Sequence, residues 1–514
     1  QRSLAAAYPA APASVRIARA SWLTGAGGTT PAITELQEIA ASSEGGDRDL
    51  ARVRLGAARY AARRDAAAHD YLRKLSVAPG EVDAERWYYI AATARRLGRA
   101  DAMREALDAL DAHYPTSRWR LEALLSAASQ ALVENQPREY EPLYRACFEN
   151  FASEPRAALC HWKVAWIAYR ESRGDRTPML REHVRRYPES EYVATALYFL
   201  GRIAATGGDP AAAKAYFEKV VSRYPNYYYA LLAREQLSER AIARAQPSDA
   251  ANVLALPSPR LPGSFQPDAA TERRLERARL LRLAGLNEWA ESELRFGART
   301  DAQPHVAGLE MARAAAGRGE HRRGLHLLRQ TGLEYLEWPF EAAPLEFWRT
   351  AFPLPYRDLV EKYSQDNEID AFLVAGLIRQ ESAFDPRAVS RARAMGLTQV
   401  RPLTGRDLSR RLGLRGFTAS MLFRPEVNLR LGTFHLRNAI EEFEGRMELV
   451  LASYNAGRSR ALAWKDWGTF QEPAEFIETI PFTETRGYVQ AVLRNAAMYR
   501  RLYGGSASAN GGGR

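Results

Sequence analysis

The stretch IDAFLVAGLIRQESAFDP, residues 369–386, has the spacing of apolar residues that is typical of a helix. Four apolar residues recur in it every three or four positions, as on one face of a helix: Ile369, Phe372, Leu373 and Leu377. Glu381 lies on the same face, one turn after Leu377. Burial raises the pKa of a carboxylic acid, because it disfavours the charged form. The pattern predicts a carboxyl group that keeps its proton near neutral pH, as a general acid requires, although a fraying amphipathic helix would look the same.

The 514-residue chain, of 57.5 kDa, is several times the usual domain length, so we expect two to four domains. Its net charge of +11 and its pI near 9.6 favour acidic partners, such as nucleic acid, a membrane surface or an anionic cell-wall polymer. No nucleic-acid-binding motif accompanies the basic residues, so we expect no nucleic-acid partner. No apolar run approaches the length of a membrane span.

The cysteine and histidine content argues against a metal site. Cys147 and Cys160 are the only cysteines, too few for a zinc site, and they could form one disulfide across a helical hairpin or remain buried thiols. The eight His residues form no ligand-type cluster, so we expect neither a metal nor a cofactor. The chain begins at Gln1 instead of Met, as expected of a mature form whose export signal has been removed, although a trimmed chain would look the same.

Residues 1–267 are predicted to form a helical-repeat domain, because they lack the alternation of apolar and polar residues that is typical of strands. The pair Tyr114-Pro115 recurs as Tyr187-Pro188 and Tyr224-Pro225. The first two pairs are 187 − 114 = 73 residues apart and the last two are 224 − 187 = 37 apart, so the repeat is about 37 residues long. Phe151-Ala152 occupies the position of a degenerate copy. A repeat of this length holds two helices that bury their faces against neighbouring repeats, which predicts an α-helical solenoid.

The rest of the chain divides into three further segments. The sequence LPSPRLPG at residues 256–263 cannot continue a helix, and a short helical linker domain is expected at residues 268–352. Pro353 and Pro355 mark the entry to the last domain, residues 353–504, which contains the opening helix. Residues 505–514 are rich in Gly, Ser and Asn, and we expect a disordered tail.

Four short motifs follow one another in the last domain: Glu381-Ser382, Gly396-Leu397-Thr398-Gln399, Tyr454-Asn455-Ala456-Gly457 and the segment 480–489. Each could be ordinary structure by itself. Together they resemble the soluble lytic transglycosylases, bacterial enzymes that cut the glycan strands of peptidoglycan and whose catalytic domain is similar to goose-type lysozyme. The resemblance, which the segment 425–428 extends, implies an all-α protein with an N-terminal superhelix, a short helical linker domain and a lysozyme-like, mostly helical catalytic domain.

Three positions depart from the family pattern. Thr398 replaces a Met, Arg393 replaces a Gly, and Arg401 replaces a second Met. Thr398 and Arg401 would place polar or charged groups near the expected sugar site. The departures concern sugar binding and turnover, since Glu381 itself is present.

The resemblance implies a reaction with a single catalytic carboxyl, unlike glycosidases that use two. Glu381 would protonate the oxygen between N-acetylmuramic acid and N-acetylglucosamine, and then deprotonate the C6 hydroxyl to close a 1,6-anhydro ring. The substrate-binding residues implied by the family are Ser390, Gln399, Tyr454 and Asn455. The supporting residues are Ser382, Tyr488 and Glu484, of which Glu484 would bond Tyr454 or serve only as an N-terminal helix acid.

We therefore expect a periplasmic, soluble lytic transglycosylase that acts as a monomer on peptidoglycan glycan strands. Proteins of cell-wall synthesis or division are candidate partners. Two alternatives stay open: a helical-repeat scaffold with a degenerate catalytic unit, and a hydrolytic muramidase whose products are one water heavier.

Overall fold

The computed structural model describes residues 11–331 and 334–506, and this part of the chain is all-α, as predicted. It contains 27 α-helices and no strand, with isolated bridges joining Met395 to Val389 and to Val400. The chain divides into two units, Gln1–His183 and Val184–Arg514. The predicted boundaries after residues 267 and 352 lie inside the second unit and stay predictions. Of the expected tail, residues 507–514 lie outside the described residues.

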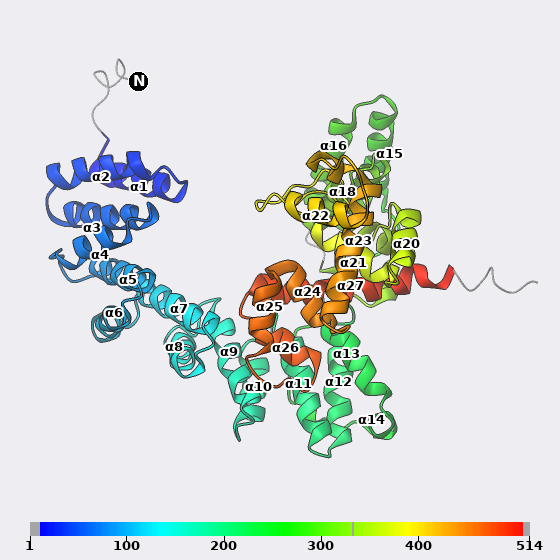
Figure 1. Ribbon diagram of the computed structural model, residues 1–514, viewed down its shortest axis with the longest axis horizontal. Helices are drawn as coiled ribbons and strands as arrows, with labels where there is room; N and C mark the ends of the chain where they lie inside the picture. Colours follow the sequence, from blue (N-terminus) through cyan, green and yellow to red (C-terminus); the bar gives the residue numbers. More distant parts are fainter. Residues whose placement is uncertain (1–10, 332–333, 507–514) are drawn as a thin grey trace, which may run out of the picture. The chain divides into compact units, whose positions relative to one another are not determined.

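The first unit is a series of helix pairs: α1 (Ala13–Gly25), α2 (Thr29–Ser42), α3 (Gly45–Ala61), α4 (Asp65–Arg73), α5 (Glu81–Arg96), α6 (Ala100–His113), α7 (Arg118–Val133), α8 (Pro137–Asn150) and α9 (Ala157–Arg170). Helix α10 (Arg176–Arg186) contains the boundary with the second unit. From α1 to α9 each helix packs on the next, and α1, α3, α5 and α7 also pack one on the next in a single layer (Figure 1). The buried apolar residues form small clusters within neighbouring pairs, as expected of a solenoid.

The predicted repeat is visible in how the helices end. Tyr114, Phe151 and Tyr224 directly follow α6, α8 and α12 (Pro210–Arg223), with φ/ψ of −137°/51°, −127°/46° and −128°/51°. Tyr114 and Tyr224 precede prolines, which disfavour a helical conformation in the preceding residue. Phe151 adopts the same conformation without a proline, so the helix ends in the same way at the position predicted for a degenerate copy.

A disulfide joins Cys147 on α8 to Cys160 on α9, which decides between the two states that the sequence allowed. The Cα atoms are 6.2 Å apart, and both side chains are fully buried. The bridge therefore fixes the pairing of two consecutive helices. Among the described residues, no helix combines the length and the apolar character needed to cross a membrane.

The second unit begins with α11 (Val193–Thr206), α12, α13 (Tyr228–Ser238) and the short α14 (Arg240–Arg244). Residues 256–263 are not helical, as the prolines predicted. Five helices follow: α15 (Ala269–Leu283), α16 (Asn287–Thr300), α17 (Pro304–Gly317), α18 (His321–Gln330) and α19 (Leu345–Ala351). The short 3-10 helices are η1 (Asp249–Ala251), η2 (Tyr335–Glu337), η3 (Phe340–Ala342), η4 (Ala419–Phe423) and η5 (Gly504–Ser506).

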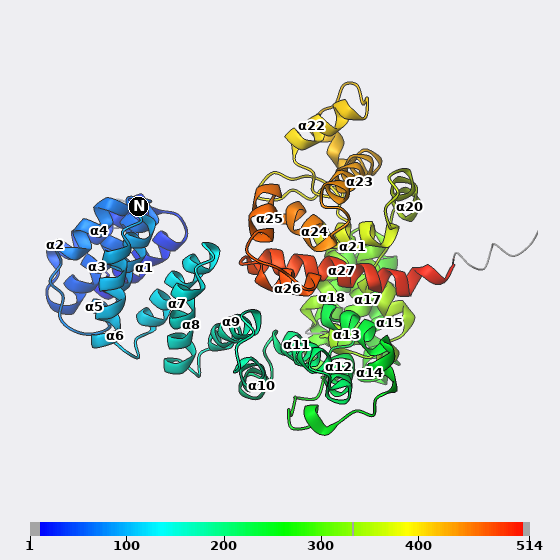
Figure 2. The ribbon, with the colours of Figure 1, turned by 60° about the horizontal axis from the view of Figure 1, so that its bottom comes forward.

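The C-terminal helices are α20 (Arg357–Asp366), α21 (Ala371–Glu381), α22 (Pro402–Arg411), α23 (Pro425–Glu442), α24 (Met447–Ala456), α25 (Arg458–Lys465), α26 (Pro473–Thr479) and α27 (Thr483–Tyr503). Helix α21 packs along α27 (Figure 2). A Cβ atom on Gly376 would lie 2.8 Å from the Val492 carbonyl oxygen and 2.9 Å from the Ala496 nitrogen. Only glycine at this position permits so close an approach of the two helices.

Candidate active site

Glu381 is the last residue of α21, the helix that the opening stretch predicts. Asp370 begins this helix by accepting a hydrogen bond from the Phe372 backbone nitrogen at 2.9 Å. The chain turns sharply just beyond Glu381, where Ala383 and Phe384 have φ angles of 52° and 63°. Two consecutive non-glycine residues in the left-handed region cost about 1–2 kcal/mol each, and such strain is concentrated at functional sites.

The carboxyl group of Glu381 is partly exposed and has one close hydrogen-bond donor. The buried Tyr488 hydroxyl, on α27, donates to Glu381 Oε1 at 2.6 Å. Burial raises the pKa of Glu381 to about 7, and the negative charge of Glu484 adds to the increase, while the hydrogen bond from Tyr488 opposes it. A pKa in this range allows the carboxyl group to exchange a proton near neutral pH, as a general acid or base requires.

The structure brings the four sequence motifs together around Glu381. Ser382 Oγ donates to the Leu397 carbonyl oxygen at 2.8 Å, which joins the first motif to the second. The Tyr454 hydroxyl donates to the Thr398 carbonyl oxygen at 2.8 Å, which joins the third motif to the second. Proximity to Glu381 contributes to a raised pKa of Tyr454, although burial is the larger cause.

The fourth motif is joined to the third by a side-chain hydrogen bond. Thr485 Oγ1, in the first turn of α27, donates to Asn455 Oδ1 at 2.7 Å. The residue after Asn455 ends α24, so this contact ties the end of one helix to the start of another. Helices α21, α24 and α27 thus converge on the same carboxyl group.

Two predicted sugar-binding residues belong to the loop between α21 and α22. Gln399 has a φ of 52°, and its amide nitrogen donates to the carbonyl oxygens of Gly396 at 2.8 Å and Ala388 at 3.2 Å. Ser390 lies in an exposed turn, where its Oγ accepts a hydrogen bond from the Ala394 nitrogen at 3.0 Å. In this structure the Gln399 amide nitrogen braces the loop, and Ser390 shapes its turn.

The predicted contact of Glu484 with Tyr454 stays a prediction. Glu484 lies exposed in the first turn of α27, and the Tyr454 hydroxyl donates to Thr398 instead of to Glu484. Its connection to the site is electrostatic, through the pKa of Glu381. An acid in the first turn of a helix is also favoured by the helix dipole, the second role that the sequence allowed.

Thr398 does not face the site, contrary to expectation. Its side chain is 1% exposed, and both its backbone nitrogen and its Oγ1 donate to Asn428 Oδ1, at 2.8 and 2.7 Å. A Cβ on Gly432 would lie 2.1 Å from Thr398 Oγ1, so α23 accommodates the threonine only because it has a glycine there. The substitution therefore changes the packing between α23 and the loop that joins α21 to α22. It adds no polar group to the solvent-facing side of this loop.

The other two departures have separate consequences. Arg393 has a φ of 60°, in the region where the family's glycine is free of strain. Its backbone nitrogen donates to the Ser390 carbonyl oxygen at 2.9 Å, so the turn forms at a cost of about 1–2 kcal/mol. Arg401 is exposed just before α22, and its charge contributes to the lowered pKa of His435.

The sequence alone did not point to His435 or to a role for Asn428. His435 lies on α23 with its ring 5.3 Å from that of Tyr454, and burial is the main cause of its lowered pKa. Asn428 donates to the carbonyl oxygens of Met395 and Leu422, both at 2.9 Å, in addition to its contacts with Thr398. The two residues are seven positions apart on one helix, a spacing that could have indicated a shared face.

Comparison with protein families agrees with this geometry. Residues 358–477, which contain Glu381 and the first three motifs, match the family described as "Transglycosylase SLT domain". Over this region the chain is similar to transglycosylase SLT domains. Residues 479–507 match a second family, described as "Soluble lytic transglycosylase helical domain". In the structure this second match corresponds to α27 and its flanks, which pack against the SLT domain.

Two curated relatives each match less than a third of this chain. The chain is 36% identical to the soluble lytic murein transglycosylase of Escherichia coli (strain K12) over 155 residues, which cover 30% of this chain and 24% of the relative. It is 34% identical over 151 residues to the putative soluble lytic murein transglycosylase of Haemophilus influenzae, covering 29% of this chain and 26% of the relative. The match thus spans about a quarter of these proteins.

A solved structure extends the likeness in fold beyond the SLT domain. An inactive mutant of the lytic transglycosylase Slt from Pseudomonas aeruginosa superposes with a TM-score of 0.63, over 95% of this chain and 81% of that chain. The two sequences are 19% identical, so this likeness concerns the fold alone.

Proposed function

We propose that this protein is a lytic transglycosylase that cleaves the bond between N-acetylmuramic acid and N-acetylglucosamine in peptidoglycan. The observation that carries the proposal is the environment of Glu381 within an SLT domain. Burial holds the pKa of this carboxyl at about 7, and Tyr488 fixes its Oε1 atom. A pKa in this range keeps part of the population protonated near neutral pH, ready to donate to a glycosidic oxygen.

In the proposed reaction Glu381 acts twice. It first gives its proton to the oxygen of the leaving sugar, while the acetamido group of N-acetylmuramic acid assists bond cleavage. The carboxylate then removes the proton of the C6 hydroxyl, whose oxygen bonds to C1 and closes a 1,6-anhydro ring. The proton balance returns Glu381 to its starting state, and no water is consumed. One carboxyl suffices because its raised pKa lies close to the working pH.

We further propose roles for the residues that surround Glu381. Ser390, Gln399, Tyr454 and Asn455 would bind the acetamido groups and the reacting sugar. Ser382 anchors the second motif through Leu397, and Glu484 acts on Glu381 through its charge. The disulfide between Cys147 and Cys160 favours an oxidising compartment, in line with a periplasmic enzyme.

The test is digestion of purified peptidoglycan by the full chain, with the products identified by mass spectrometry. We expect 1,6-anhydromuramyl products from the wild-type protein and none from Glu381→Gln, whose amide keeps the shape of the side chain but has no proton to donate. Circular dichroism should show an unchanged helical content in the variant. Products one water heavier would identify a hydrolytic muramidase. No cleavage by a folded wild-type protein would favour a scaffold with a degenerate catalytic unit.

A further inference from the structure

A recess in the first unit brings together opposite charges from three successive helix pairs. It has a volume of about 490 Å³, and its charged residues are Arg54 on α3, Glu81 and Glu85 on α5, and Arg118 at the start of α7. Trp119, Leu50 and Val82 supply its apolar surface. The residues come from α3, α5 and α7, which pack on one another in a single layer.

Glu85 is the unusual member of this set. Its side chain is only 3% exposed, and its Oε1 lies 2.8 Å from Arg54 Nε. The two atoms form a close ion pair, but their contact does not meet the geometry of a hydrogen bond. A buried carboxylate without a directed hydrogen bond is costly unless another donor reaches it.

The balance of forces on Glu85 shows that Arg54 does not compensate for its burial. Burial raises the pKa of Glu85 to about 7, although the charges of Arg54 and Arg118 and the short side-chain contact with Arg54 all act to lower it. Glu81 adds to the increase and is itself an acceptor for Ser117 Oγ at 2.9 Å. A cationic N–H donor entering the recess would stabilise the ionised form of Glu85.

The guanidinium groups of Arg54 and Arg118 lie near the Trp119 ring in the recess. Arg118 is exposed and lies over the Trp119 ring at 4.5 Å, and Arg54 lies 5.8 Å from the centre of the same ring. A purely anionic ligand would meet Glu81 and Glu85, and a purely cationic one would meet the two arginines. A ligand with both charges can bind its carboxylate to an arginine and its amine to Glu85, while its aliphatic carbons lie against Trp119.

We propose that this recess binds an amino-acid head group with a free ammonium and a free carboxylate, carried on the peptide stem of peptidoglycan. The identity of the stem as ligand rests on the proposed function. The recess would hold the stem at a site in the first unit, in addition to the glycan site of the SLT domain.

The test uses isothermal titration calorimetry with the full chain and a stem tetrapeptide released from peptidoglycan, with its amine and carboxylates free. We expect binding that weakens at least tenfold in Glu85→Gln and, independently, in Arg118→Gln. Arg118 is exposed, so its replacement leaves the core of the first unit unchanged. Acetylating the amine of the peptide should weaken binding in the same way, because it removes the cation and leaves the carboxylates. Chitotetraose, a glycan without a stem, should not bind in a way that either variant alters.

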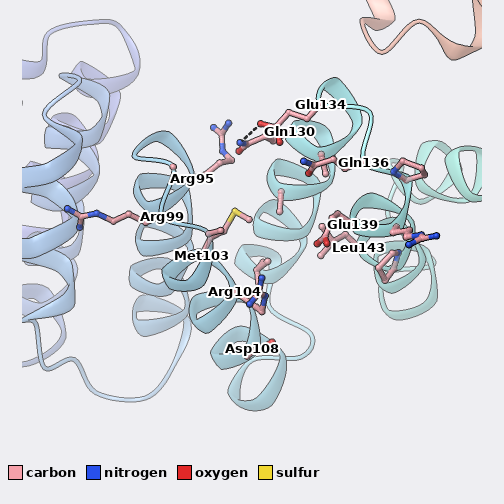
Figure 3. A pocket seen from close by; sticks show the side chains of 18 residues that line it. Arg95, Arg99, Met103, Arg104, Asp108, Gln130, Glu134, Gln136, Glu139 and Leu143 are labelled. Carbon is pink, nitrogen blue, oxygen red and sulfur yellow. Dashed lines mark hydrogen bonds between the residues drawn. The ribbon is translucent and has the colours of Figure 1, made fainter. Parts of the chain in front are cut away.

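Matched control variants come from the larger recess of the first unit, of about 900 Å³, between α6, α7 and α8 (Figure 3). Arg104 and Glu139 line it and are exposed, so Arg104→Gln and Glu139→Gln change the same charges elsewhere in the unit. Both controls should bind the tetrapeptide like the wild type. Equal binding of the acetylated peptide, or wild-type affinity in both Glu85→Gln and Arg118→Gln, would overturn the proposal.

The binding test is separate from the test of catalysis. If the tetrapeptide binds nowhere in the first unit while anhydromuramyl products are still formed, the inference about the recess fails and the proposed function stands. If no cleavage occurs but the variants weaken peptide binding, the proposed function fails and the recess remains a binding site for this head group. In both recess variants, formation of anhydromuramyl products should persist.

Discussion

At the scale of single residues, Glu381 is controlled by groups with opposite effects on its proton. Burial and Glu484 favour the protonated acid, whereas the hydrogen bond from Tyr488 favours the carboxylate. Tyr488 keeps its own proton in this contact and donates to the ionised carboxylate, because burial raises its own pKa well above the usual value. The structure thus separates the residue that carries the proton from the residue that adjusts its pKa.

Tyr488→Phe removes this hydrogen bond and keeps the ring. We expect the pKa of Glu381 to rise further above 7, because the ionised carboxyl loses a donor. The alkaline limb of the kcat/KM profile, where Glu381 loses its proton, should move to higher pH by up to about one unit. The measurement is the pH dependence of peptidoglycan cleavage.

Tyr499→Phe is the matched control for this variant. Tyr499 is buried on the same helix and donates to the Pro353 carbonyl oxygen at 2.9 Å. Its loss should leave the alkaline limb in place. An unchanged limb in Tyr488→Phe would mean that Tyr488 does not set the pKa of the catalytic group.

The sequence predicted single residues well where the information was local. The spacing of apolar residues placed Glu381 at the end of a helix, and the structure has α21 ending there. It could not predict which partner Tyr454 would choose, because Thr398 and Glu484 lie in different segments and only the packing of α24 decides between them. The sequence likewise could not predict that the Thr398 side chain is buried, because this depends on its hydrogen bond to Asn428 and on the space beside Gly432.

At the scale of elements, the disulfide links α8 to α9 and closes a loop of 13 residues. Closing a loop of this size stabilises the folded state by about 3 kcal/mol in the chain-entropy account. Reduction should therefore make α8 and α9 open more often, with amide hydrogen exchange in these helices faster by roughly 100-fold. Exchange measured by mass spectrometry, with and without reductant, checks this expectation.

The double variant Cys147→Ala, Cys160→Ala supplies the control, since its exchange should not respond to reductant. Unchanged exchange in α8 and α9 of the wild type, after reduction has been verified, would show that helix packing alone maintains this pair.

The Tyr-Pro repeat could be predicted from the sequence, whereas the recess at Glu85 could not. The Tyr-Pro pairs mark where helices end, a property of the local backbone that recurs along the sequence. Arg54, Glu85 and Arg118 are separated by about one repeat from each other in the chain, and only the stacking of α3, α5 and α7 brings them together. The sequence of a solenoid does not indicate which charged residues of successive repeats will lie next to one another.

At the scale of the whole molecule, the net charge of +11 acquires a role if the substrate is the anionic cell wall. Charge attraction between exposed groups weakens as salt shortens the Debye length, from about 10 Å at 0.1 M to about 3 Å at 1 M. Arg and Lys residues spread over a large surface would then contribute to retention on the polymer without taking part in catalysis. Burial of Glu381 limits such screening at this carboxyl group.

We therefore expect binding of the full-length Glu381→Gln variant to insoluble peptidoglycan to fall several-fold when salt is raised from about 0.1 to 1 M. Co-sedimentation measures the bound fraction without interference from cleavage. Peptidoglycan whose carboxylates have been converted to amides is the control, and binding to it should be weaker and nearly independent of salt, because the attraction requires the negative charge of the polymer. Equal binding to both polymers at both salt concentrations would show that the positive charge does not hold the protein on the wall, and that retention depends on specific sites such as the SLT domain and the recess at Glu85.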